Sequence, residues 1–339
     1  MRRLAATALG AALAASAPIA AADADRAAPL AEGRFATLFE PSGVARLPDG
    51  SLLVVEDEAA QALRRVRIDP EGDDDRPRVL EETVLAPAGG PLARLAIGPL
   101  EDLEGAASDR AGRVFAIGSH GAGRRGADRR KLMRFTVSGH EATDLVLTRN
   151  LYRDLTLAHP ALAAELDGDG RDERRRLNIE GLAYDLRRGA LLIGLRTPRL
   201  DDRAVIVRLL NPDAYIADGA RPRFDVEPWT LELDKGGLRA MDYDERSDRL
   251  LLVSRRETRG GGRFKLWHAR ADGEGRPSRV RLPAGKKLLD DVEGVAVLDR
   301  GPAATRGVLF VRDDGRRGKG RGADWFVLPR AELGLDRAE

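Results

Sequence analysis

The feature that most constrains the fold is a short motif that recurs five times along the chain. Its clearest copies are Asp-Leu-Glu-Gly at 102–105, Asn-Ile-Glu-Gly at 178–181 and Asp-Val-Glu-Gly at 291–294. Two altered copies, within 41–46 and 237–244, have Ser42 and Arg239 where the others have Glu. When the copies are aligned, one column, hereafter the variable column, contains Ser42, Glu104, Glu180, Arg239 and Glu293. A motif that returns in this way indicates a repeat architecture.

Each motif is followed by a turn and then by a run of apolar residues. These runs occupy residues 52–55, 114–117, 191–194, 250–253 and 308–311. Short apolar runs bounded by Gly, Asp and Arg are typical of buried strands. Third strands are predicted at 62–68, 132–137, 204–210, 264–269 and 325–328, and fourth strands at 78–85, 140–147, 224–233 and 279–282.

Four strands per unit predict an all-β fold, a five-bladed β-propeller, with six blades as the alternative count. The units are spaced by 62, 76, 59 and 54 residues, so their loops vary in length. The last unit lacks a fourth strand, and residues 34–39 can supply it, which would close the ring and remove an exposed edge. The predicted propeller covers 33–330, with a short helical insertion at 150–177 over one face and a C-terminal tail at 331–339.

The N-terminus has the pattern of a secretory signal peptide. Arg2 and Arg3 precede an Ala-rich apolar stretch at 4–21, and small residues near Ala22 and Ala24 offer cleavage sites. We therefore predict a signal peptide at 1–24, a flexible lead-in at 25–32 and export to the periplasm or the medium. A disordered or membrane-anchoring N-terminus is the alternative.

Composition narrows the classes of partner. Removal of Arg2 and Arg3 lowers the basic residues from 57 to 55, against 55 acidic residues, so net charge gives no case for nucleic acid binding. No later stretch is apolar for long enough to span a bilayer. The absence of Cys excludes disulfides, a thiol nucleophile and thiolate metal ligands. We expect a monomer.

Two of the motifs carry a family resemblance. The copy at 102–105 leads into Ala-Ile-Gly-Ser-His at 116–120, and the copy at 178–183 leads into Leu-Ile-Gly-Leu-Arg-Thr-Pro at 192–198. Together they resemble an exported bacterial family of propeller type, catalogued as a domain of unknown function. More distantly, the Glu-Gly repeat resembles phytase-like propellers described as having esterase-like activity. The first resemblance implies fold and export, and fold analogy does not assign a reaction.

Strand register predicts where the variable column lies. In a propeller, the first strand of each blade begins and the second strand ends at the same mouth of the central channel. A second ring of residues, at the ends of the second strands, should therefore meet the variable column there. Its members are Asp57, Ser119, Arg196, Arg255 and Asp313. Units three and four would make one side of the mouth cationic, and the other three units would make the opposite side anionic.

Carboxylates crowded near an axis require a cation or arginines as partners. A divalent cation, calcium above all, prefers such oxygen ligands. The predicted metal ligands are Glu104, Glu180, Glu293, Asp102 and Asp291. The predicted contacts to an anionic small molecule or protein partner are Arg196, Arg239, Arg255 and Ser119. No organic cofactor is indicated.

Two functional hypotheses follow. One is an exported binding protein that holds an anionic ligand at the mouth, together with a structural cation. The other is a metal-assisted hydrolase of phosphate or carboxylate esters, in which His120 and Glu104 would be catalytic. The sequence favours binding, because it contains no dense cluster of His and Asp ligands.

Structural explanations compete with both hypotheses. Recurrent glutamates can tie blades together by accepting backbone N–H groups of the next blade, although this leaves Arg196 and Arg255 unexplained. His120 can be a turn histidine bonded to a neighbouring carboxylate. The stretch 167–173 resembles a calcium loop, but Arg171 and Asn178 depart from the EF-hand pattern at positions five and twelve, so we expect a polar turn.

Overall fold

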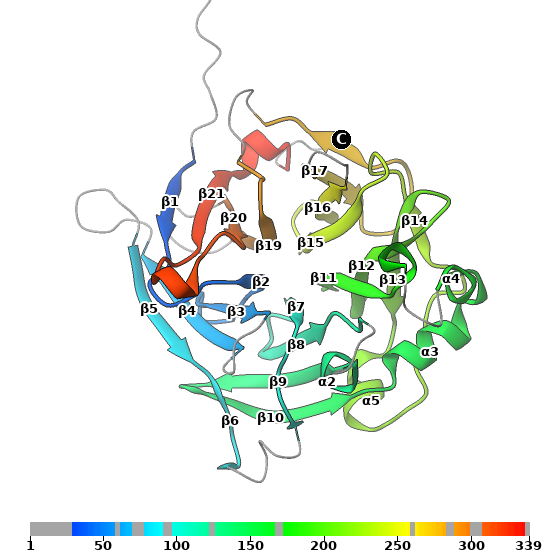
Figure 1. Ribbon diagram of the computed structural model, residues 1–339, viewed down its shortest axis with the longest axis horizontal. Helices are drawn as coiled ribbons and strands as arrows, with labels where there is room; N and C mark the ends of the chain where they lie inside the picture. Colours follow the sequence, from blue (N-terminus) through cyan, green and yellow to red (C-terminus); the bar gives the residue numbers. More distant parts are fainter. Residues whose placement is uncertain are drawn as a thin grey trace, which may run out of the picture.

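The computed structural model describes residues 29–57, 62–69, 78–90, 97–121, 126–166, 172–257, 262–282, 288–298 and 307–335. Over these residues the chain forms five sheets around one axis, a β-propeller of five blades (Figure 1). The predicted fold class is confirmed, with five blades and not six. The predicted signal peptide lies outside the described residues, as do parts of the lead-in and of the polar turn.

The strands follow the predicted order in every blade. Blade one contains β2 (Pro41–Arg46), β3 (Leu52–Glu56), β4 (Leu63–Asp69) and β5 (Arg78–Val84). Blade two contains β7 (Leu103–Ser108), β8 (Arg113–Gly118), β9 (Leu132–Ser138) and β10 (Glu141–Thr148), with β6 (Ala86–Pro87) beside β10. Blade three contains β11 (Asn178–Asp185), β12 (Ala190–Leu200), β13 (Arg203–Leu209) and β14 (Trp229–Leu231). Blade four contains β15 (Gly237–Asp244), β16 (Arg249–Arg256), β17 (Arg263–Arg270) and β18 (Ser278–Val280). Blade five contains β19 (Val292–Leu298), β20 (Gly307–Arg312), β21 (Asp324–Pro329) and the N-terminal β1 (Ala31–Arg34).

The two ends of the chain close the ring in blade five, where β1 pairs antiparallel with β21. The predicted closing strand at 34–39 is wrong in position, since β1 ends at Arg34 and covers part of the predicted lead-in. Phe35 and Leu38 are both buried, and this spacing of three does not fit the alternation of a strand. The carboxylate of Glu82 in β5 accepts the amide of Thr37 at 2.6 Å, which holds this segment as a connector.

The C-terminal end also differs from the expected tail. The 3-10 helix η5 (Arg330–Leu333) follows β21, and Leu333 and Leu335 are buried in the core between blades four and five. The described propeller therefore extends to residue 335.

Each innermost strand has a break in register at the variable column. The pairing partners skip from Pro41 to Gly43, Leu103 to Gly105, Ile179 to Gly181, Leu238 to Ala240 and Val292 to Gly294. A β-bulge of this kind leaves one residue unpaired and changes the direction of its side chain. All five members of the variable column are therefore bulge residues.

Glycine follows the bulge in four blades because the innermost strands approach one another closely. A Cβ atom on Gly105 would lie 2.8 Å from Cβ of Leu182, and one on Gly43 would lie 2.8 Å from Cα of Gly105. The space left on the axis is only about 10 Å³, lined in part by Val44, Leu182 and Val295. Such a void is about the size of one water, so the channel is closed and the mouth is a cup with an apolar floor.

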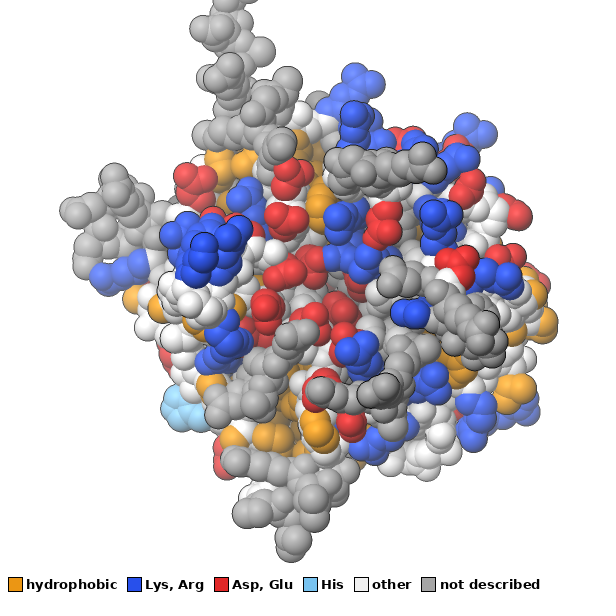
Figure 2. Space-filling model, in the orientation of Figure 1, with side chains coloured by type: hydrophobic (Ala, Val, Ile, Leu, Met, Phe, Trp, Pro, Cys, Tyr) orange, Lys and Arg blue, Asp and Glu red, His pale blue; other side chains and the backbone are white. Residues whose placement is uncertain are grey.

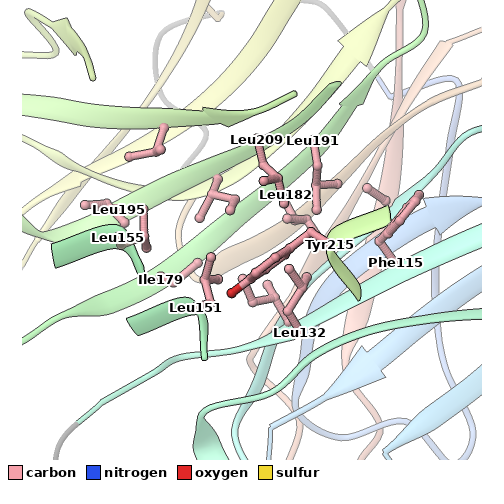
Figure 3. Packing of buried hydrophobic residues seen from close by; sticks show 14 of the residues in the cluster. Phe115, Leu132, Leu151, Leu155, Ile179, Leu182, Leu191, Leu195, Leu209 and Tyr215 are labelled. Carbon is pink, nitrogen blue, oxygen red and sulfur yellow. The ribbon is translucent and has the colours of Figure 1, made fainter. Parts of the chain in front are cut away.

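The helical insertion packs against blades two and three. It contains α3 (Leu151–Ala158), α4 (Pro160–Glu165) and the 3-10 helix η2 (Glu173–Arg175). Figure 3 shows Leu151 and Leu155 of α3 pointing into a cluster with Ile179 of β11. Each fully buried leucine contributes about 1.5–3 kcal/mol to folding. The insertion is thereby anchored, and η2 is held beside the mouth.

Two further short helices were not predicted, α5 (Pro212–Ala217) and α2 (Gly126–Arg129). Helix α5 begins with Pro212, which fits the first turn of a helix although it suggests a break when the sequence alone is read. Among the described residues, no helix is long and apolar enough to cross a membrane.

Candidate functional site

The bulges bring four charged side chains of the variable column to one mouth of the closed channel: Glu104, Glu180, Arg239 and Glu293. Figure 2 looks onto this face and shows acidic side chains around its centre, with Lys and Arg side chains against them on one side. The fifth member, Ser42, has a small side chain and is buried. The mouth is therefore uneven, with one short residue beside Glu104.

Arg239 is the centre of an ion-pair network in blades three to five. Its guanidinium contacts Glu180 at 2.6 Å and also pairs with Glu293. Arg239 is 5% exposed, and Glu180 is 3% exposed. A buried arginine between two carboxylates neutralises most of their charge, so these three residues form a structural network.

Arg196, within the second strand of blade three (β12), extends this network outward. It donates to Oε1 of Glu180 at 2.7 Å and pairs with Glu257 at the end of β16. The hydrogen bond from Arg196 holds the pKa of Glu257 below its ordinary value, despite partial desolvation. The predicted cationic side of the mouth is therefore largely neutralised by Glu180, Glu257 and Glu293.

The other side of the mouth contains an acidic triad, which we define as Asp57, Asp102 and Glu104. One carboxylate oxygen from each residue lies within 4.8 Å of the other two. Glu104 is only 9% exposed, and no described residue donates a hydrogen bond to its carboxylate or pairs with it. Arg129 approaches Asp102 at 3.6 Å. The triad therefore contains a buried carboxylate whose charge has no direct protein partner within the described chain.

This arrangement changes the acidity of Glu104. Burial raises the pKa of Glu104 well above its ordinary value, and the nearby Glu180, Asp57 and Asp102 raise it further, while Arg239 opposes the change. Across the mouth, Asp313 keeps an exposed surface, yet desolvation of its carboxyl and the neighbouring Glu40 raise its pKa to about 6. Both groups resist ionisation, which a bound cation would reverse.

Main-chain hydrogen bonds between blades fix the triad in place. The amide of Asp102 donates to the carbonyl of Asp57 at 2.6 Å, and the amide of Ile179 donates to the carbonyl of Ser119 at 2.9 Å. The amide of Ser119 donates to the carbonyl of Asp102 at 2.9 Å, and its hydroxyl donates to the carboxylate of Asp102. The triad is thus held by the ends of strands, which are more rigid positions than loops.

A hollow of about 620 Å³ opens beside the triad, and we call it the first hollow. Asp102, Glu104 and Ser119 line one end of this hollow. Asn178, Arg196 and Arg174 of η2 are among the other residues that line it. Its volume is that of a site for a small molecule. A cation held by the triad would therefore have room for further ligands on its open side.

Several predicted site residues lie elsewhere. His120 is fully buried, and its Nδ1 lies 2.8 Å from the carbonyl of Gly118. It does not line the first hollow, and burial lowers its pKa to about 4, so it is not placed to act as a base at the mouth. We expected a turn histidine bonded to a carboxylate. The ring of His120 instead contacts the backbone carbonyl of Gly118.

Asp291 is exposed and does not join the triad, although its backbone carbonyl accepts the amide of Asp313 at 2.7 Å. Arg255 lies outside the first hollow, over the ring of Phe264. Asp57 was expected in the second ring but not among the metal ligands. These placements depend on strand ends and loops beside the bulges, for which the sequence carries no clear signal.

The blade-tying alternative applies to a different residue. In the described part of the chain, Glu104, Glu180 and Glu293 accept no backbone N–H from another blade. Asp242 of β15 does so, because its Oδ2 accepts the amide of Val297 in blade five at 2.7 Å. At the mouth, blades three to five are joined by the ion pairs of Arg239 with Glu180 and Glu293, and Glu104 is left available for other contacts.

No protein-family model matches the sequence, and no curated protein matches it. Among solved structures, the chain is similar to hydrazine synthase of Kuenenia stuttgartiensis, with 10% identity over 82% of this chain and 78% of that chain and a TM-score of 0.40. It is similar to U3-55K, with 8% identity over 89% and 100% of the two chains and a TM-score of 0.40. PorZ, a surface component of the type-IX secretion system of Porphyromonas gingivalis, is 12% identical over 87% of this chain and 34% of that chain, with a TM-score of 0.37. These similarities carry no argument about function.

Proposed function

We propose that the protein is an exported binding protein whose channel mouth holds a divalent cation, calcium above all, and through it an anionic ligand. The observation that carries the proposal is Glu104, a carboxylate that is nine-tenths buried, has no direct partner among the described residues and faces two other carboxylates. A buried charge without a partner is costly to the fold. A cation at this position would remove that cost.

The chemistry of the triad favours calcium. Calcium takes six to eight oxygen ligands in flexible geometry, and carboxylates are its usual protein ligands. The triad offers carboxylate oxygens only, with no nitrogen or sulfur that would favour zinc or copper. Three carboxylates leave coordination positions open toward the first hollow, where water or an anionic group of a ligand would complete the shell.

The roles first assigned to arginines change within this proposal. Arg239 and Arg196 support the mouth by pairing with glutamates, and Glu180 and Glu293 serve that network as well. Arg196 still lines the first hollow and can contact a bound anion from there. Asp102 and Glu104 keep the role of cation ligands, joined by Asp57.

The hydrolase hypothesis is the weaker of the two. It requires a general base beside the cation, and His120 is buried away from the first hollow. Glu104 would have to act both as a ligand and as a base. A panel of phosphate and carboxylate esters, tested with and without calcium, would support hydrolysis only if turnover depended on calcium and on Glu104.

The proposal is tested by titrating chelator-treated protein with calcium in a calorimeter. We expect one site per chain, with affinity reduced at least tenfold in Glu104→Gln and in Asp102→Asn, since each change removes one charged ligand. Asp185→Asn, a matched change of a buried carboxylate at the opposite end of an innermost strand, should leave calcium affinity within twofold. Absence of calcium-dependent heat in the wild type would refute the proposal.

A further inference from the structure

A second hollow of about 930 Å³ continues from the first along blades three and four. The two share Asp172, Arg174, Arg196, Thr197 and Glu257, and the Arg196–Glu257 ion pair lies where they meet. The lining of the second hollow contains more basic than acidic side chains: Arg174, Arg175, Arg196, Arg199, Lys235, Arg255 and Arg256 against Glu165, Asp172, Asp201, Asp202 and Glu257. A ligand that starts at the triad can therefore extend into a region rich in basic side chains.

Not all of these cations are neutralised by the protein. The carboxylate of Asp202 forms ion pairs with Lys235 at 2.8 Å and with Arg199 at 3.4 Å. The carboxylate of Glu257 pairs with Arg196. By contrast, Arg174, Arg255 and Arg256 contact no carboxylate among the described residues. Three guanidinium groups around one hollow thus keep their capacity for an external anion.

Arg255 lines the second hollow and is held there by packing. Its Nε is buried and has no hydrogen-bond partner among the residues that the structure describes. The guanidinium is held 5.2 Å above the ring of Phe264, and Gly262 leaves the space that Nε occupies, because a Cβ there would lie 2.1 Å from it. The arginine is thereby held in place by packing, without a protein oxygen for this donor.

We propose that the two hollows together bind an extended, multiply charged oxyanion, with one anionic group on the cation and the next groups on Arg174, Arg255 and Arg256. This inference rests on the proposed cation site. Guanidinium groups bind phosphate and carboxylate oxygens through paired hydrogen bonds. No aromatic ring is among the described residues that line either hollow, so neither offers a platform for stacking a nucleobase. The chemistry therefore points to a linear oligoanion, of which an oligophosphate is the simplest.

The test compares orthophosphate, pyrophosphate and tripolyphosphate by calorimetry with calcium-loaded protein at a fixed free calcium concentration. We expect affinity to rise at least tenfold from orthophosphate to tripolyphosphate, because the longer anion reaches the second hollow. Arg255→Ala and Arg256→Ala should each lower tripolyphosphate affinity at least fivefold and leave orthophosphate and calcium affinity within twofold. Tricarballylate, a linear tricarboxylate, distinguishes recognition of charge in general from recognition of phosphate.

The control is Arg276→Ala, which removes the same charge from an exposed turn outside both hollows. Equal affinity for the three phosphates, or an equal loss in Arg276→Ala, would overturn the inference. Failure of the cation site is separate, because it appears as a lack of calcium binding without phosphate. If the dependence on length and on Arg255 persists in chelated protein, the oxyanion groove stands and only its link to the cation is lost.

Discussion

Acidic residues recur at both ends of the innermost strands, but within the described chain Glu104 at the mouth lacks the protein partners that the carboxylates at the other end have. At the end away from the mouth, hereafter the turn end, Asp109, Asp185 and Asp244 lie at or just after the last residue of β7, β11 and β15. Asp109 accepts the amides of Ala111 and Arg113 at 2.9 Å, and Asp185 accepts two amides of its own turn at 3.1 Å. These carboxylates are satisfied by the protein itself.

At the mouth, the bulges point the carboxylates toward the axis, where no turn follows to offer amides. The pKa values show the difference. Desolvation raises the pKa of Asp244, but hydrogen bonds from Arg330 and Ser247 outweigh it and bring this pKa below its ordinary value. The pKa of Glu104, by contrast, is raised. Repetition of an acidic residue therefore does not by itself mark a binding site. A structural carboxylate has hydrogen-bond donors of the protein close by, and a carboxylate that can bind a ligand lacks them.

The largest effect is expected from breaking a satisfied pair at the turn end. Arg330 donates to both oxygens of Asp244, at 2.9 and 2.7 Å, and both residues are buried. Arg330→Ala would leave Asp244 charged and buried, and we expect a loss of about 3–5 kcal/mol in the free energy of unfolding. Denaturant unfolding monitored by Trp fluorescence measures it.

Arg276→Ala is again the matched control, with an expected change within about 0.5 kcal/mol, as for most surface substitutions. A loss in Arg330→Ala no larger than in this control would mean that the turn end does not depend on its ion pairs, and the comparison would fail.

At the mouth, removal of a charge should stabilise the fold. Glu104→Gln keeps the shape of the side chain and removes like-charge repulsion, so the metal-free variant should gain about 1–4 kcal/mol at pH 7.5, the range of Coulomb's law for one pair of unit charges about 4 Å apart. Asp185→Asn at the turn end should instead lose about 1–3 kcal/mol, because it disturbs a satisfied buried acceptor. Thermal unfolding of both variants after chelation checks these opposite signs.

The same contrast predicts a pH dependence. A carboxyl group with a raised pKa in the folded state binds more protons there than in the unfolded chain, so its stabilising contribution is present below the unfolded pKa and lost as pH rises through the folded pKa. Metal-free wild type should therefore become more stable as the pH falls from 7.5 to 5.5, the window around the pKa of about 6 of Asp313, and the raised pKa of Glu104 should add to this gain. Glu104→Gln should show a smaller rise, and an equal rise in both proteins would exclude Glu104 as its source.

Much of the fold followed from the sequence, because the variable column and the apolar runs have regular spacing that reflects strands and turns. The closing strand was misplaced since Phe35 and Leu38 are apolar and buried without being in a strand. For the site, strand register brought Glu104, Glu180, Arg239 and Glu293 to one mouth. It could not tell which carboxylates pair with arginine, because that depends on bulge direction and on side chains from neighbouring blades.

In our proposal the acidic triad, unlike the carboxylates of the turn end, is completed by a cation. The most direct measurement is an anomalous difference map from crystals grown with calcium or with manganese in its place. We predict one strong peak within about 2.1–2.6 Å of oxygens from Asp57, Asp102 and Glu104, the range of metal–oxygen bonds for such cations. A map with no peak at the triad at saturating metal, or with its strongest peak at the turn end, would contradict the account.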